Sequence, residues 1–241
     1  MGFRIIAAFC LLSPLTASAQ GDNLFKSDRD PNKANQFSIA AGAGLAFPFT
    51  DVNRSSTQPV FGAGAQYAAQ PWLGINLDFQ FGKLKGGDRT DASVSYMEFS
   101  NNFFYSAVTA RFYPLRLALN RKTEADVQTN IKYLGGLYAG VGAGIIVNNV
   151  DAYNAPDAGM IPDRNGSQIV VPAELGYMLP IAHLNPAYKG KVYGRSQLSL
   201  HISYRHNLSF SEKLDGYNPP GYQNKSKDAF STLTLGLVYN L

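Results

Sequence analysis

Apolar residues alternate with small or polar residues along most of the chain, and the alternation has a period of two. In the clearest stretch, residues 196–210, Leu200 and Ile202 fall on one face, while Ser199 and His201 fall on the other. A period of two places successive side chains on opposite faces of a β-strand. The pattern therefore predicts a strand with one apolar and one polar face.

Seven further segments alternate in the same way. They cover residues 37–47, 61–67, 73–82, 104–112, 137–148, 168–179 and 233–241. A tilted strand needs about 9–11 residues to cross a bilayer, and most of these segments reach that length. Leu115–Asn130 carries five charges and no sustained alternation, so we expect a connection there rather than a further strand.

The second face separates a membrane barrel from a soluble sheet protein, because it is small and polar with many glycines. In a membrane barrel, apolar side chains face lipid and small or polar ones fill the lumen. The sequence predicts an all-β fold, an eight-stranded antiparallel up-and-down transmembrane β-barrel. A secreted β-sandwich and a soluble lipocalin-like barrel are the alternatives.

The N-terminus has the order of features found in a secretory signal peptide. Arg4 gives one positive charge, Ile5–Leu15 is mostly apolar, and Ala17–Ala19 forms a small-x-small cleavage site. We expect a signal peptide over residues 1–19, a flexible leader over residues 20–35 and the barrel over residues 36–241. The one cysteine, Cys10, lies in the signal, so the mature chain has no disulfide or thiolate site.

Strand alternation, with the N-terminus in the periplasm, assigns an end of the barrel to each connection. The outer loops are expected at residues 50–59, 84–101, 149–166 and 211–228, and two long periplasmic connections at residues 115–132 and 180–195. Aromatic residues then fall in two girdles. The outer girdle is Phe47, Phe61, Phe81, Phe104 and Phe210, and the periplasmic girdle is Phe37, Tyr67, Trp72, Phe112, Tyr177 and Tyr239.

Four charged residues fall on the inward face: Asp78, Arg111, Glu174 and Arg205. Because unpaired charges are unfavourable in a narrow lumen, the two acids and two bases are expected to pair and plug it. The alternative is a constriction that selects ions. The formal net charge of +4 is small and scattered, and predicts no nucleic-acid partner.

The signal, the eight alternating segments and the ending Leu233–Leu241 resemble the small outer-membrane β-barrel family, the eight-stranded OmpA/OmpX-like group. The resemblance implies location in the outer membrane of a Gram-negative bacterium, with outer-membrane lipids as surroundings. It also implies that the barrel assembly machinery reads the last strand, with Tyr239 and Leu241 on its lipid face. The chain ends at that strand, so no peptidoglycan-binding domain is expected. Members have varied activities, so the family implies a fold and not one function.

His201-x-Ser203 resembles the His-x-Ser pair of outer-membrane lipid A deacylases. Tyr204 and Arg205 follow it, unlike the enzymes' pattern, and both His201 and Ser203 face the lumen, away from lipid. We therefore expect no catalytic residues and no enzyme. The remaining histidines, His183 and His206, are too far apart to predict a metal site.

The glycine repeats lie inside strands with a period of two, so they predict no nucleotide loop, and no cofactor is expected. The expected function is a non-enzymatic outer-membrane barrel that presents surface loops and supports envelope integrity. A narrow passive pore and a lipid A-modifying enzyme are the alternatives. The sequence does not identify a ligand for the loops.

Overall fold

The computed structural model describes residues 37–50, 55–88, 97–119, 134–154, 159–161, 165–182, 198–210, 214 and 228–241. Eight long strands form the wall. They are β1 (Phe37–Phe49), β3 (Gln58–Gln70), β4 (Leu73–Gly87), β5 (Met97–Phe112), β6 (Leu137–Asn154), β8 (Gly166–Ala182), β9 (Leu198–Ser209) and β10 (Ala229–Asn240). Strands β2 (Ser55–Ser56) and β7 (Gly159–Ile161) and helix α1 (Pro114–Leu119) are short additions.

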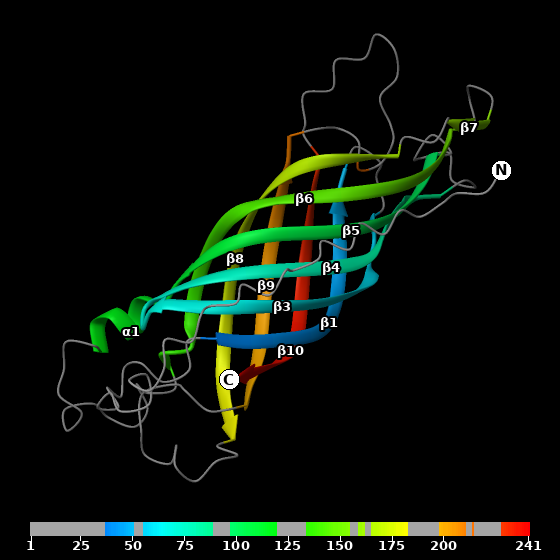
Figure 1. Ribbon diagram of the computed structural model, residues 1–241. Helices are drawn as coiled ribbons and strands as arrows, with labels where there is room; N and C mark the ends of the chain where they lie inside the picture. Colours follow the sequence, from blue (N-terminus) through cyan, green and yellow to red (C-terminus); the bar gives the residue numbers. More distant parts are fainter. Residues whose placement is uncertain are drawn as a thin grey trace, which may run out of the picture. The chain divides into compact units, whose positions relative to one another are not determined.

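The wall closes on itself, because β1 pairs with β10 as well as with β3 (Figure 1). Every pairing around the ring is antiparallel. This confirms the predicted eight-stranded antiparallel barrel. Among the described residues, no helix is long and apolar enough to cross a membrane.

The strands are staggered, and the register can be followed once around the ring. Paired residues run Ser199, Val238, Ala40, Gly64, Asp78, Ala107, Gly144, Val170 and Ser209. The circuit returns to β9 ten residues beyond its start, from Ser199 to Ser209. For a closed barrel such a stagger requires the strands to tilt by about 35–45° from the axis.

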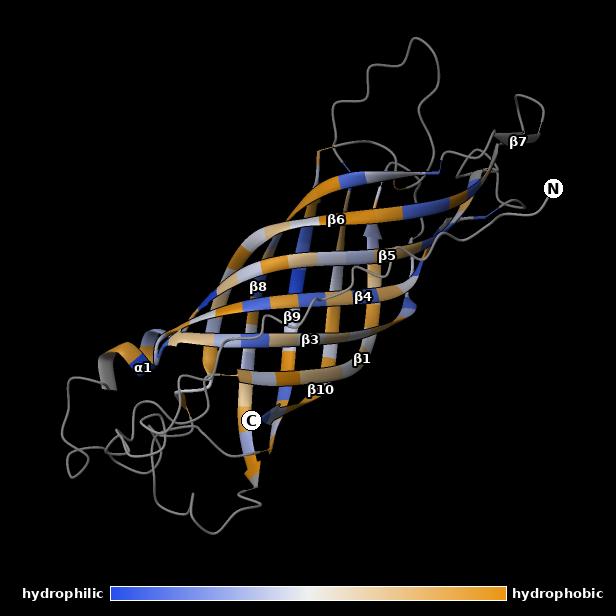
Figure 2. Cartoon of the chain, viewed as in Figure 1, coloured by the Kyte–Doolittle hydropathy of each residue, from blue (hydrophilic) through white to orange (hydrophobic). Residues whose placement is uncertain are grey.

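The two faces of the wall differ as the alternation predicts. Outward positions are apolar and exposed, as for Val141 and Leu235, which are 59% and 54% exposed. Inward positions are glycine, small residues or buried polar residues such as Thr109 and Ser203. Figure 2 shows the result on β4, where hydrophilic and hydrophobic segments alternate along the strand.

Three predicted outer loops are partly strand. Residues 50–59 contain β2 and the start of β3 at Gln58. Strand β4 continues to Gly87, β5 begins at Met97 and β6 continues to Asn154, so residues 84–101 and 149–166 are not entirely loop. The prediction was wrong there because the alternation changes phase: beyond the apolar band the inward residues are apolar, such as Leu84 and Phe99, and the outward ones are polar.

Other predicted segments lie wholly or partly outside the described residues. The predicted signal peptide and leader fall there, as do most of the connections at residues 115–132 and 180–195. Within the first connection the structure adds helix α1, where Arg116 Nε donates a hydrogen bond of 2.8 Å to the Gly135 carbonyl.

Candidate functional site

The four inward charges come from four different strands and meet in one cluster. Asp78 is on β4, Arg111 on β5, Glu174 on β8 and Arg205 on β9. Arg111, Glu174 and Arg205 are at most 3% exposed, and Asp78 is half-buried. Register explains part of the cluster, since Glu174 is paired directly with Arg205 across β8 and β9.

Arg111 and Glu174 form the best-ordered pair. Arg111 Nε and Nη2 donate to the two carboxylate oxygens of Glu174 at 3.2 and 2.9 Å, a bidentate arrangement. Nη1 donates to Gln66 Oε1 at 3.1 Å and to Asn76 Oδ1 at 3.0 Å. The guanidinium thereby holds β3, β4, β5 and β8 in one arrangement.

Arg205 is less completely satisfied. Its Nη2 lies 2.5 Å from Asp78 Oδ2 and 3.4 Å from Glu174 Oε1. Its Nε and Nη1 have no hydrogen-bond partner within the described part of the chain. Arg111 also approaches Asp78, at 3.5 Å, so the two acids and two bases form one neutral cluster.

Tyr138 and His201 extend this cluster toward the end of the barrel where β6 and β9 begin. The Tyr138 hydroxyl donates to Glu174 Oε1 at 2.8 Å and lies 2.6 Å from His201 Nε2. Since the hydroxyl has one hydrogen, Nε2 of His201 carries the proton in this arrangement. Tyr138 was not identified from the sequence. Because it lies two residues before Gly140 on the same strand, its side chain faces inward as the position of Gly140 does.

A small cavity lies beside the cluster, on the side of the lumen lined by β1, β3 and β10. Its volume is about 40 Å³, and its walls include Gly42, Gly64 and Gly236 together with Asp78 and Arg205. A water needs about 10–15 Å³ of such space, so the cavity has room for a few waters.

Beyond the charge cluster, the other half of the lumen holds a layer of apolar side chains alongside buried polar residues such as Asn148 and Gln168. Phe103, Tyr105 and Phe230 are buried together, with the Phe103 and Phe230 rings 5.5 Å apart. Leu214 adds to this layer from the segment between β9 and β10 and is fully buried. Its amide donates to Asp228 Oδ2 at 3.0 Å, and its carbonyl accepts a hydrogen bond from Asn101 at 2.8 Å.

The two residues of the candidate His-x-Ser pair, His201 and Ser203, bond to other residues and not to each other. His201 contacts Tyr138, and Ser203 Oγ lies 2.7 Å from Thr234 Oγ1. Both side chains are buried in the lumen wall, at 9% and 4% exposure. Within the residues that the structure describes, no three His, Cys, Asp or Glu side chains are grouped to hold a metal ion.

His206, which interrupts the apolar outward face of β9, has polar neighbours. Ser231 Oγ lies 2.8 Å from both His206 Nδ1 and the Tyr204 hydroxyl, and the Phe49 ring packs edge-on against His206. Polar groups facing lipid are unfavourable unless they bond to one another. This cluster satisfies that condition. His183 lies outside the described residues.

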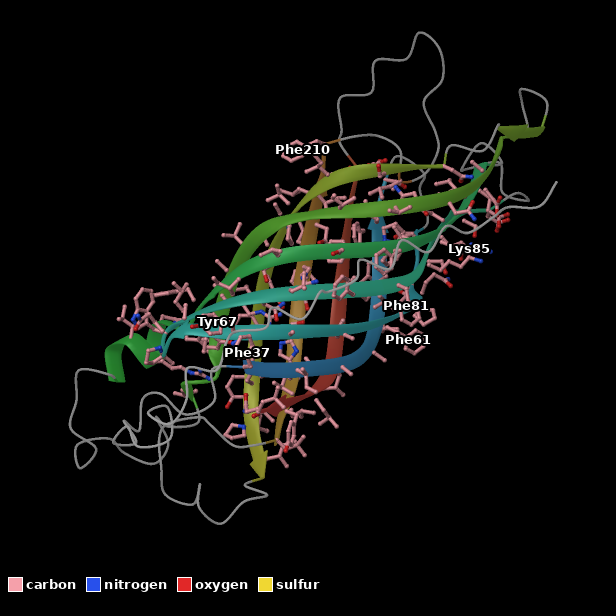
Figure 3. All side chains as sticks on the ribbon, viewed as in Figure 1. Phe37, Phe61, Tyr67, Phe81, Lys85 and Phe210 are labelled. Atoms are coloured by element: carbon pink, nitrogen blue, oxygen red, sulfur yellow. The ribbon has the colours of Figure 1, made fainter. Side chains whose placement is uncertain are left out.

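The exterior carries an apolar band between two aromatic girdles. On β6 the apolar outward positions run from Leu137 to Val147, which corresponds to about 25 Å along the axis at ~3.3 Å per residue and a tilt of ~40°. Figure 3 shows Phe37 and Tyr67 toward one end, and Phe61 and Phe81 toward the other. A band of about 25 Å is typical of outer-membrane barrels.

The chain folds as a small transmembrane-type β-barrel. No family model matches its sequence, and no curated protein matches it. It is similar in structure to Neisserial surface protein A (14% identity, covering 86% of this chain and 97% of that one, TM-score 0.44). It is also similar to Ail, the attachment invasion locus protein of Yersinia pestis (14% identity, covering 86% of this chain and 99% of that one, TM-score 0.43). A third similar structure is the outer membrane protein OprG from Pseudomonas aeruginosa (10% identity, covering 86% of this chain and 97% of that one, TM-score 0.39).

Proposed function

We propose that this chain is an integral outer-membrane β-barrel without enzymatic activity, which presents surface loops and supports envelope integrity. The observation that carries the proposal is the combination of an apolar exterior with an interior of paired charges. An exposed apolar surface of this extent is unfavourable in water, and it is satisfied when lipid surrounds the barrel.

The interior supports a structural role because its two layers are filled by side chains. The charge cluster occupies one layer, and the apolar cluster around Phe103 and Phe230 occupies the next. Eight strands enclose little more than the volume of their inward side chains. We therefore expect a closed lumen, with function residing in the exterior and the loops.

The same proposal covers export and assembly. Residues 1–19 are a signal peptide that is removed before Gln20, and residues 20–35 are a leader to the barrel. The assembly machinery recognises the end of β10, where Tyr239 and Leu241 face outward. Mass spectrometry of the mature protein tests the first part, since an N-terminus other than Gln20 contradicts it.

Conductance across planar bilayers tests the closed lumen. The refolded barrel should insert, show the heat-modifiable mobility of a folded barrel, and give no steady conductance. Steady ion-selective currents from the folded protein would contradict closure. In cells, a deletion strain should become more sensitive to detergent, and the Ser203→Ala variant should restore resistance because Ser203 has no chemical role.

A narrow passive pore is the second candidate, and the small cavity beside Arg205 favours it. Currents whose ion selectivity changes in Glu174→Gln, with the folded fraction unchanged, would support the pore. A lipid A-modifying activity has weaker support, because His201 and Ser203 are buried in the lumen wall and bonded to other residues. Unchanged lipid A mass profiles in the deletion strain are the expected result.

A further inference from the structure

Two lysines continue the outward stripe of β4 beyond the aromatic girdle. Outward positions on this strand are apolar up to Phe81, and the next two in the same parity are Lys83 and Lys85. Phe81 stacks on Phe61 of β3 with ring centroids 5.5 Å apart. Figure 3 shows Lys85 beyond Phe61 and Phe81 at this end of the barrel.

The position of the lysines along the axis is that of lipid headgroups. Lys83 lies two residues and Lys85 four residues beyond Phe81, or about 5 Å and about 10 Å along the axis. Aromatic girdles mark the boundary between acyl chains and headgroups. Lysines just beyond such a girdle extend into the layer where lipid phosphates lie.

The residues paired directly with the two lysines across β4 and β5 are hydrogen-bonding groups without charge. Lys83 is paired across the strands with Asn102, and Lys85 with Ser100. Lys83 makes no ion pair with any other residue that the structure describes. Lys85 lies 3.2 Å from Glu98, and its side chain is still 42% exposed.

The acidic residues that the structure describes on this wall lie beside or beyond Lys85, not beside Lys83. Glu98 is two residues beyond Ser100 on β5, and Asp151 is paired with Ser100 on β6. Along β4 the outward face is therefore apolar up to Phe81 and basic at Lys83 and Lys85, with the carboxylates beside or beyond Lys85. A phosphate that approaches along the lipid surface meets Lys83 before it meets these carboxylates.

We propose that Lys83 and Lys85 bind a phosphate group of an outer-leaflet lipid headgroup, with the Asn102 amide as a further donor. The proposal rests on the proposed membrane placement of the barrel, with this end outward. Phe61 and Phe81 pack against the acyl chains of the same lipid, and the lysine ammonium groups bind its phosphate. An anionic partner in solution would bind the lysines but would leave the rings of Phe61 and Phe81 without a contact.

Native mass spectrometry of the detergent-purified barrel tests the site. The probes are bisphosphorylated lipid A, dephosphorylated lipid A and phosphatidylglycerol. The wild type should retain bisphosphorylated lipid A roughly twentyfold better than the dephosphorylated form, at about fivefold per lysine near a charged surface. If phosphatidylglycerol is retained as well as bisphosphorylated lipid A, the site binds the phosphate of any anionic lipid, which supports the proposal. If phosphatidylglycerol is retained much more weakly, the site is specific for the phosphates of lipid A.

The matched variants are Lys83→Gln/Lys85→Gln and Lys83→Arg/Lys85→Arg. The glutamine pair should lose the preference for phosphorylated lipid A, and the arginine pair should keep it. Equal retention of both lipid A forms by the wild type, or an unchanged preference in the glutamine pair, would overturn the proposal. Folding into neutral vesicles is measured in parallel: if all variants fold there while the preference is absent, the headgroup site fails and membrane insertion stands.

Discussion

At the residue scale, Glu174 connects more of the lumen than its size suggests. It accepts hydrogen bonds from Arg111 and Tyr138 and lies within ion-pair distance of Arg205. Its parity, and that of the three other charges, can be read from the sequence. The partners are harder to predict, because they depend on a ten-residue stagger around the ring that no single segment encodes.

Glu174→Gln removes the charge that Arg111 and Arg205 share. Leaving buried guanidinium groups underpaired should lower the free energy of unfolding in neutral lipid vesicles by about 3 kcal/mol. Lys85→Gln is the control, because it breaks a more exposed pair with Glu98, and it should change stability by about 0–1 kcal/mol. Equal effects of the two substitutions would show that the cluster does not stabilise the barrel.

Gly176 and Gly140 are inward glycines whose neighbours differ. A Cβ at Gly176 would lie 2.3 Å from the Tyr138 hydroxyl oxygen, while one at Gly140 would lie 3.3 Å from its nearest atom. Gly176→Ala should therefore displace Tyr138 from Glu174 and His201 and lower stability by about 1–3 kcal/mol. Gly140→Ala should have a smaller effect. Urea unfolding in vesicles compares the two, and the reverse order would contradict this packing.

At the element scale, the strands could be predicted wherever the outward face is apolar and the inward face is small or polar. The phase change beyond Phe81 hid the outer ends of β4, β5 and β6, because polar residues there face outward and apolar residues inward, as in a soluble sheet. Pro172 shows a second feature that the alternation does not predict, an interruption in the strand pairing. It has no amide hydrogen, and the β6–β8 pairing is interrupted opposite it, at Gly142 and Ala143.

Depth along a strand sets the penalty for a charge on the lipid face. Val141 lies near the middle of the apolar stretch of β6, whereas Leu200 is two residues from the start of β9 and its neighbour on β10 is Leu237. Val141→Arg should cost about 2–4 kcal/mol and Leu200→Arg about 0–1 kcal/mol. Folding free energies in vesicles measure both, and equal penalties would mean that the band is placed wrongly.

At the scale of the whole molecule, the lumen contains two different fillings in series. The charge cluster was accessible to sequence reasoning, because a charged residue at an inward position stands out. The apolar layer was not, because Phe103 and Phe230 read as ordinary strand aromatics and Leu214 comes from a connection. A path for ions has to cross both layers, so opening either one alone should leave the barrel closed.

Phe103→Ala/Phe230→Ala tests this arrangement in series. The variant removes two ring systems from the outer layer and leaves Arg111, Glu174 and Tyr138 in place. It should lose stability, since each Phe→Ala change in a packed core costs about 3–5 kcal/mol. The milder Phe103→Leu/Phe230→Leu replaces it if the barrel no longer folds. Planar-bilayer recordings of the folded variant should still show no steady conductance, because the charge cluster fills the next layer. Steady currents in a variant that remains folded would show that the apolar layer alone closes the lumen and that the charge cluster is permeable to ions.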